Sequence, residues 1–297
     1  MITTLPVPLE ILLDPVSLTI IAMYAGLMLW EAIAPAKKLP KVKGWKMRGM
    51  ISFAVFFYLS SYLPMFMDSF LAQHQLFDLG GLGTWGGAIA GVLVFQFGVY
   101  VWHRAMHGSD ILWRGFHQMH HSAERLDTYG AFYFSPADMI GWTLQGSICL
   151  VLLVGITPQA ASIVLLTMTL MAMFTHTNVK TPRWLGYIIE RPESHSVHHA
   201  RGAHRNNYSE LPLFDILFGT FKNPETYVEE TGFYVGASAR VVEMMLFKDV
   251  AAAEQWDEVR VERLNFYIPA GCNSEAYYTG SELITVDYGW RLIHPMS

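Results

Sequence analysis

Histidine is the residue type whose spacing in this sequence indicates chemistry. Five histidines fall between positions 103 and 121, in the run H-R-A-M-H-G-S-D-I-L-W-R-G-F-H-Q-M-H-H, and three more form H-S-V-H-H at 195–199. Residues three or four positions apart share one face of a helix, so each set is expected to present two or three imidazoles to one point. Nine of the twelve histidines belong to this pattern: His103, His107, His117, His120, His121, His176, His195, His198 and His199.

This number of imidazoles indicates a metal centre with more than one ion. Neutral imidazole is a ligand suited to iron, zinc, copper and nickel. A structural zinc takes four ligands, and a catalytic zinc usually takes three and keeps one position open. The two cysteines form no C-x-x-C motif, so the donors must be nitrogen and oxygen. We therefore predict a dinuclear site in which the nine histidines act as metal ligands and catalytic residues.

The other three histidines are weaker candidates for metal ligands. His74 follows an apolar run and is expected to be an interfacial residue, and His294 is expected to lie on the surface. His204 lies five residues after the second H-x-x-H-H motif. It is either a further metal ligand or a hydrogen-bond partner of one, and the sequence leaves both options open.

The composition indicates a membrane protein. Of the 297 residues, 52% are apolar and only 15% are charged, against about a quarter charged in ordinary soluble domains. Five apolar runs approach the ~20 residues needed to cross a bilayer: 16–34, 50–71, 84–102, 139–156 and 158–175. We expect an all-α bundle of four or five spans or re-entrant helices, with a cytosolic, histidine-rich helical cap and a mixed C-terminal tail. The N-terminus lacks the basic region of a cleaved signal peptide and is expected to be retained.

The basic residues predict the orientation of the bundle. All twenty Lys and Arg residues fall within 37–48, within 104–125 or from 180 onward. Cytoplasmic loops are enriched in such residues. If each apolar run crosses the bilayer once, all three basic segments lie on the same side of the membrane. The runs that end at His103 and His176 finish on this side too, so the histidine cluster is expected at the cytoplasmic membrane face. The mild net charge of −5 argues against a nucleic-acid partner.

Two domains are expected. Residues 1–235 would form the membrane-embedded domain with the histidine motifs at 103–199, and residues 236–297 a cytosolic C-terminal extension. Within the extension, 237–255 has an amphipathic helical pattern, and 265–297 contains short alternating runs.

The order of the motifs resembles the fatty acid hydroxylase superfamily, which includes the sterol desaturases. The chain has H-x-x-x-H, then H-x-x-H-H, a lone histidine after an apolar hairpin, and a second H-x-x-H-H followed by N-Y and D-I-L-F-G-T, over roughly 99–221. The resemblance implies an integral membrane di-iron enzyme, with two iron ions held by the nine histidines. It would use O2 and two external electrons to hydroxylate or desaturate a C–H bond of a lipid such as a sterol, fatty acyl or isoprenoid chain.

The expected partners follow from this resemblance. The sequence has no haem-binding domain, no G-x-G-x-x-G motif and no cysteine cluster, so electrons would come from a separate ferredoxin or cytochrome b5 type protein with its reductase. The lipid would enter laterally from the bilayer. Six aromatic residues near the expected interface are candidates to line its path: Tyr100, Trp102, Phe132, Tyr133, Phe134 and Trp142.

The sequence departs from the family pattern at two positions. Ser135 precedes Pro136 where many sterol-type relatives have histidine, and Lys180 stands where fatty acid 2-hydroxylases have a second histidine. His204, Asn178 or a water would then complete one metal, and the sequence does not choose among them. Four acidic residues near the motifs are candidates to hydrogen-bond the ligands: Glu124, Asp127, Glu193 and Asp215, the last with an alternative role in the D-I-L-F-G-T turn.

Two other classes of function are compatible with clustered histidines. A membrane zinc-dependent hydrolase of a lipid is the main alternative, although the chain has no H-E-x-x-H motif and no acidic residue inside its histidine motifs. A haem or metal-transport protein would need histidines within the apolar runs, which contain none. Zinc without iron in the purified protein would favour the hydrolase, and a Soret band would favour a haem protein.

Overall fold

The chain divides into two compact units. The computed structural model describes residues 4–251, 274–279 and 282–287, and the division falls between residues 1–250 and 251–297. It therefore lies fifteen residues after the expected boundary at 235/236, and the assignment of two domains stays a prediction.

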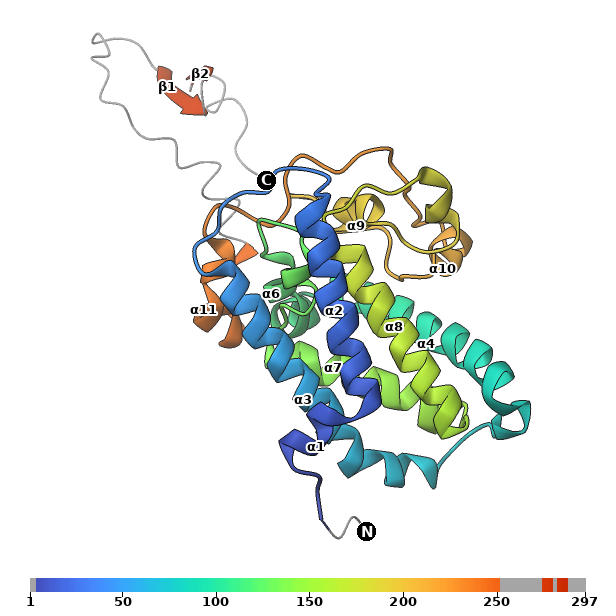
Figure 1. Cartoon of the computed structure of the whole chain (residues 1–297). Helices are drawn as coiled ribbons and strands as arrows, with labels where there is room; N and C mark the ends of the chain where they lie inside the picture. The colour runs from blue at the N-terminus through green and yellow to red at the C-terminus, as the bar shows by residue number, and fades with distance from the viewer. Residues whose placement is uncertain (1–3, 252–273, 280–281, 288–297) are drawn as a thin grey trace. The chain divides into compact units, whose positions relative to one another are not determined.

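The first unit is a bundle of long apolar helices (Figure 1). The long elements are α2 (Pro15–Ile33), α3 (Trp45–Ala72), α4 (Gly83–Gly108), α7 (Pro136–Ser147) with its π-helical continuation η4 (Ile148–Leu153), and α8 (Pro158–His176). These form five candidate spans, each long and apolar enough to cross a membrane. The chain is thus a multi-pass integral membrane protein, and the predicted all-helical membrane bundle is confirmed.

Local sequence signals fix where several of these helices begin. Asp14, Ser135 and Thr157 are N-caps whose side chains accept hydrogen bonds from backbone N–H groups of the first turn. In each case proline follows directly, in the first helical position, where its missing N–H costs nothing. Ser135, which stands in place of a possible histidine ligand, is therefore the start signal of α7.

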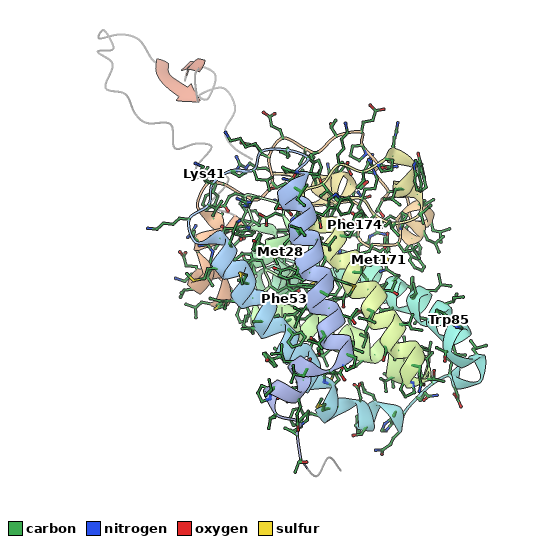
Figure 2. The ribbon with its side chains drawn as sticks, in the orientation of Figure 1. Met28, Lys41, Phe53, Trp85, Met171 and Phe174 are labelled. Atoms are coloured by element: carbon green, nitrogen blue, oxygen red, sulfur yellow. The ribbon has the colours of Figure 1, made fainter. Side chains whose placement is uncertain are left out.

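Close packing brings the spans together. Helix α4 packs on α8, α3 on α7, and α2 on α8. A Cβ at Gly98 of α4 would lie only 2.5 Å from Cys149 Sγ, so glycine permits the close approach of α4 to η4. Figure 2 shows Met28, Phe53 and Phe174 between α2, α3 and α8, where they belong to one apolar cluster. This cluster also contains Phe134 and Met139 at the start of α7.

The α7–α8 hairpin reaches as deep as the connection between α3 and α4. The Leu76 N–H donates to the Leu152 carbonyl at 2.7 Å, and the Leu79 N–H donates to the Val154 carbonyl at 3.0 Å. The tip of the hairpin is therefore bonded to the α3–α4 loop. This pairing favours a full crossing by α7 and α8 over a shallow re-entrant dip.

Short elements complete the first unit. They are α1 (Pro8–Leu13), η1 (Gly80–Leu82), α5 (Asp110–Leu112), η2 (Trp113–His117, π-helical), α6 (Gln118–His121), η3 (Thr128–Gly130), η5 (Arg183–Tyr187), α9 (Pro192–His198), α10 (Leu213–Leu217), η6 (Ala237–Ala239) and α11 (Val241–Met245). The expected helix over 237–255 is thus wrong within the described residues. It is divided between η6 and α11 and ends before Phe247, whose φ of 58° is left-handed, while residues 252–255 lie outside the described part.

The second unit contains a β-hairpin, in keeping with the expected mixed tail. Strand β1 (Ser274–Thr279) pairs antiparallel with β2 (Glu282–Asp287), with Ser274 opposite Asp287 and Thr279 opposite Glu282. The other alternating residues of 265–297 lie outside the described residues.

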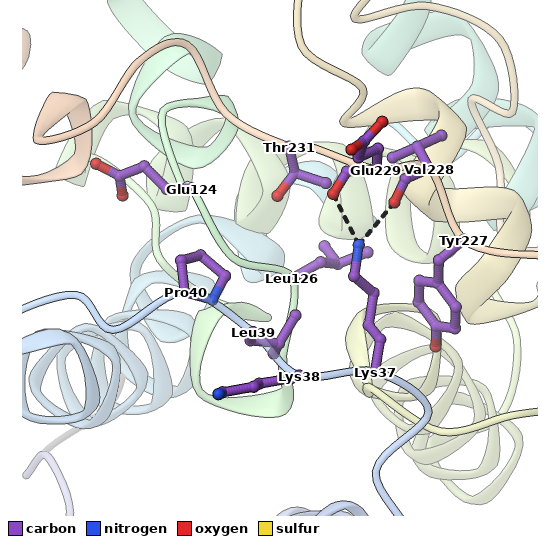
Figure 3. Close-up of a pocket in the computed structure, with 10 residues that line it drawn as sticks. All are labelled: Lys37, Lys38, Leu39, Pro40, Glu124, Leu126, Tyr227, Val228, Glu229 and Thr231. Carbon is purple, nitrogen blue, oxygen red and sulfur yellow. Dashed lines mark hydrogen bonds between the residues drawn. The ribbon is translucent and has the colours of Figure 1, made fainter. Parts of the chain in front are cut away.

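A lysine joins the α2–α3 connection to the later part of the first unit (Figure 3). The Lys37 ammonium donates to the backbone carbonyls of Val228 and Glu229, both at 2.8 Å. These residues border a small cavity of about 60 Å³ that none of the nine clustered histidines lines. The cavity is therefore separate from the candidate metal centre.

Candidate metal centre

The fold gathers all nine predicted histidines at the ends of the spans. His103 and His107 lie in the last turns of α4, and His176 is the final residue of α8. The others come from η2, α6, α9 and the residue that caps α9. They form two groups in which the candidate ligand atoms lie within 4.8 Å of one another. Group one is His103, His107, His117, His121 and His198, and group two is His120, His176, His195 and His199.

Each H-x-x-H-H motif is divided between the two groups, which corrects the expectation that a motif points to one centre. His117 and His121 belong to group one, whereas His120 belongs to group two. The second motif divides in the opposite sense, because His195 and His199 enter group two and His198 enters group one. Successive helical residues are rotated by about 100°, so the adjacent histidines of each motif point in different directions.

Backbone carbonyl groups orient three of the rings. His103 Nδ1 lies 2.9 Å from the Tyr208 carbonyl oxygen, and His198 Nδ1 lies 2.7 Å from that of Asn206. His176 Nδ1 lies 2.7 Å from the Ala172 carbonyl oxygen, one turn earlier in α8. Because a carbonyl oxygen only accepts, Nδ1 must donate a proton in each pair. The lone pair of each ring is therefore on Nε2, which is directed into the group.

Two buried carboxylates orient one ring in each group. Asp138 Oδ2 lies 3.2 Å from His117 Nδ1, and Glu190 Oε1 lies 3.3 Å from His195 Nδ1. Both acids are buried. Carboxylates that accept the second ring N–H are the common support of metal-bound histidine, because they fix the tautomer and add negative charge. Sequence reasoning missed both acids, although Glu190 lies only five residues before His195.

The four acids chosen from the sequence have other partners. Glu193 accepts from the backbone N–H and hydroxyl of Thr181, and Glu124 accepts from the backbone N–H groups of Gly236 and Ser238. The Asp127 carboxylate accepts from the Trp45 indole at 2.8 Å. None of these three carboxylates is hydrogen-bonded to a histidine ring, so their proximity in sequence to the motifs did not identify the partners of the ligands.

Asp215 supports the site from one step further away. It accepts from the backbone N–H groups of Tyr208 and Ser209 and from the Thr220 hydroxyl, at 2.7–3.0 Å. This agrees with its alternative role in the D-I-L-F-G-T turn. Because the Tyr208 carbonyl accepts from His103 Nδ1, the turn also orients a member of group one.

The ring nitrogens inside the groups are spaced as metal ligands are. His103 Nε2 lies 2.9 Å from His117 Nε2, and His176 Nε2 lies 3.0 Å from His195 Nε2. In each pair one ring, that of His103 or of His176, carries its proton on Nδ1, where it donates to a backbone carbonyl, so a lone pair on its Nε2 faces the neighbouring ring. Nitrogen ligands lie about 2.1 Å from a transition metal, so two ligands at right angles are about 3 Å apart. The residues present therefore fit a metal ion in each group.

Several buried ring nitrogens have no protein partner. The Nε2 atoms of His107, His121 and His198, all in group one, are buried without a hydrogen bond. A buried imidazole nitrogen normally has a partner, because its desolvation is costly. Metal coordination would satisfy all three.

Burial keeps the histidines of the cap in the form that binds metal. Desolvation, followed by repulsion from neighbouring histidines, lowers the pKa of His117, His120 and His121 well below the usual value. The pKa values of the three clustered histidines of 195–199 are lowered for the same reasons. These imidazoles are therefore neutral at pH 7 and offer a lone pair.

The two groups are direct neighbours. The rings of His121 and His199 stack with centroids 4.2 Å apart, although they belong to different groups. The rings of His117 and His120 are 5.2 Å apart. Two metals bound here would be close enough to act on one substrate, as in a dinuclear centre.

The remaining candidate ligands lie outside both groups. His204 Nδ1 lies 3.1 Å from His121 Nδ1, which makes it a neighbour of a group-one residue and not a member. Asn178 exchanges hydrogen bonds with the backbone of Lys37, and Lys180 is exposed. His74 is exposed and paired with the Phe70 carbonyl. His294 lies outside the described residues.

Two of the six predicted aromatic residues contact the histidines. Phe134 lies 4.8 Å from His120 of group two, and Trp142 lies 5.7 Å from His103 of group one, measured between ring centroids. Both contact the apolar cluster between α2, α3 and α8. The other four have different ring partners, for example Trp45 for Tyr133 and Phe116 for Trp102.

Comparison with known proteins agrees with this geometry. Residues 88–220 match the sequence model of the fatty acid hydroxylase family. An ornithine lipid hydroxylase of Rhizobium tropici is 34% identical over 140 residues, which cover 46% of this chain and 42% of the relative. The alkylglycerol monooxygenases of Homo sapiens and Danio rerio are each 32% identical, over 50% and 46% of this chain and over 34% and 30% of their own lengths. The matches thus span less than half of these relatives. No solved structure matches the chain.

Proposed function

We propose, on the premise that this chain is a member of the fatty acid hydroxylase family, that it is a membrane-bound non-haem di-iron oxygenase. Its reaction would hydroxylate or desaturate an unactivated C–H bond of a lipid such as a sterol, fatty acyl or isoprenoid chain, with O2 as co-substrate. The observation that carries the proposal is the pairing of imidazole Nε2 atoms at about 3 Å within two adjacent histidine groups.

The protein residues have separate roles in this proposal. The five histidines of group one would hold one iron and the four of group two the other. Asp138 and Glu190 would fix one ring in each group and supply negative charge. Bound iron would supply the redox chemistry by which O2 attacks an unactivated carbon. The surrounding side chains exclude water, since all members of group two are buried.

The substrate would reach the centre from the bilayer. Phe134 and Trp142 contact the rings of His120 and His103, and both belong to or pack against an apolar cluster that includes the span residues Met28 and Phe53. Apolar side chains thus connect the spans to the histidines. A lipid chain that follows these side chains would bring one of its carbons between the two groups.

The centre would lie at the cytoplasmic face. Among the described residues of the first unit, the Lys and Arg residues all lie in 37–48, 104–125 and 180–248, and the helix order brings these segments to one end of the bundle. Such residues accumulate on the cytoplasmic side. Electrons would come from a separate ferredoxin or cytochrome b5 type protein with its reductase, acting on that side.

Iron analysis with Mössbauer spectroscopy on protein purified in detergent tests the proposal. We expect about two coupled irons per chain, in keeping with two ligand sets, and a changed lipid profile in cells that produce the protein. One zinc per chain without iron would overturn the proposal and favour the lipid hydrolase. No metal after loading would leave the histidine groups structural.

A further inference from the structure

We propose that Trp113 is the point at which electrons enter the metal centre, and that the basic surface around it binds an acidic one-electron donor protein. This inference rests on the proposed function and adds the position of the donor. It concerns a residue that lies in none of the histidine motifs.

The protein covers group one least completely at Trp113. His107 is the only one of the nine histidines that is not fully buried. Its ring lies 5.0 Å from that of Trp113, which is itself half-buried. The indole therefore extends from the surface to the least buried member of the centre.

Trp113 contacts several rings of the same group. Its centroid lies 5.1 Å from that of His121 and 6.3 Å from that of His117, in addition to His107. No other tryptophan of the described residues contacts three members of group one. Electrons pass between proteins and buried metals more readily through a packed aromatic system than through solvent. An indole in contact with three candidate ligands offers such a path.

The loop beside Trp113 is held in an unusual conformation. His204, whose ring lies 5.7 Å from Trp113, has a φ of 42°, and Asn206 and Asn207 are also left-handed, with φ of 73° and 50°. Such backbone is sparsely populated for non-glycine residues and persists where the surrounding structure requires it. Here it keeps the His204 ring over His121, whose Nδ1 it contacts.

Three basic residues lie near Trp113 at this part of the surface. Arg114 follows Trp113, and Arg205 follows His204 and is exposed. Lys248 is also exposed, and the Gln118 side chain donates both to its carbonyl and to that of Arg114, which brings the two residues together. Asp110 and Asp249 lie in the same segments, so these five residues carry a net charge of +1. Electrostatic steering of an acidic partner to such a surface suits the small, weak interfaces of redox encounters.

Reduction kinetics test the role of Trp113. The iron-loaded protein in nanodiscs is mixed with reduced plant-type ferredoxin, an acidic one-electron donor, and reduction is followed by absorbance. We expect W113L to be reduced at least about tenfold more slowly than wild type and W113F to be intermediate, while dithionite reduces all of them alike. W102L is the matched control, because Trp102 lies in α4 near the site and contacts Phe116 instead of a ligand ring.

Binding of ferredoxin to the metal-free protein gives a readout that is independent of turnover. We expect the double variant R114Q/R205Q to bind ferredoxin several-fold more weakly than wild type, with a smaller dependence on salt. R183Q, which removes an exposed arginine paired with Glu225, should bind as wild type does.

The results separate this inference from the proposed function. Failure of dithionite to reduce any iron in the wild type would contradict the proposed function. Wild-type reduction of W113F and W113L by ferredoxin, or unchanged binding by R114Q/R205Q, would overturn the inference. If W113L loses iron, the inference is tested by the reduction of W113F and by the binding of ferredoxin to R114Q/R205Q, because both variants preserve the packing at the ligand rings.

Discussion

The two histidine groups receive their ligands from the same motifs but differ in what supports them. Group one draws on carbonyl groups of the 206–208 loop, on Asp138 and on the neighbouring ring of His204. Group two is supported by a carbonyl within α8 and by Glu190. One member of group one is partly exposed, whereas group two is entirely buried. The first group is therefore the accessible one and depends on loops, and the second is the enclosed one.

The two H-x-x-H-H motifs link the two groups. Each H-x-x-H-H motif gives two residues to one group and one to the other, so the helices that carry them connect both sites. A shift of either helix would move ligands in both groups together. The separation of the two histidine groups thus follows in part from the rotation between adjacent helical residues.

Removal of single ligands should have the largest effect and tests the division of the motifs. Under the proposed function, H120A removes a ligand from group two and H121A removes one from group one, although the two residues are adjacent. We expect each variant to remain inserted, to lose turnover and to retain about one iron instead of two, with different Mössbauer parameters. H74A, which changes an exposed histidine, is the control. Full activity in H120A would refute the assignment.

Neutralising the carboxylate of each group should weaken metal binding at that group. D138N and E190Q keep the shape of the side chain and remove its negative charge. We expect about a 10- to 100-fold loss of iron affinity, the usual result of changing such a partner. Titration against a competing chelator measures it, with the exposed E225Q as control. Unchanged affinity in both variants would show that the carboxylates do not act on the metals.

The rate of iron removal should distinguish the two groups. Because group one has a partly exposed histidine and group two has none, a ferrous chelator should remove iron in two phases. We expect the rate of the faster phase to exceed that of the slower phase by about tenfold. The faster phase should be absent from H121A, since that variant would retain only the enclosed iron. A single phase in the wild type would mean that the groups are equally accessible.

Changing Asp215 should have a smaller effect, confined to the loop that supports group one. D215A leaves the buried N–H groups of Tyr208 and Ser209 without an acceptor, at a cost of about 2–4 kcal/mol in unfolding free energy. A lower midpoint of thermal unfolding checks this, and D215N should lose less because it keeps one acceptor oxygen. The iron of group one should be the more weakly held, and equal weakening of both irons would argue against a local role.

The sequence alone determined the identity of the histidines and the layout of the spans. The spacing of histidines and the length of an apolar run are local properties of the sequence, so the five spans and the nine spaced imidazoles could be predicted from neighbouring residues. Cap signals such as Ser135 and Thr157 are local as well. The amphipathic pattern after 237 was less informative, because packing of Ser238 and Met244 against the bundle breaks that segment into short turns.

Only the tertiary structure decided which imidazoles share a metal site and what holds them. The division of each motif follows from the rotation of adjacent residues combined with the positions of α4, α8 and α9, which no single helix specifies. Asp138 lies 21 residues from His117, and the Tyr208 carbonyl lies 105 residues from His103. Such pairs form because close packing of the spans removes water from the site, and buried ring N–H groups must then find acceptors in whatever segment the fold places beside them.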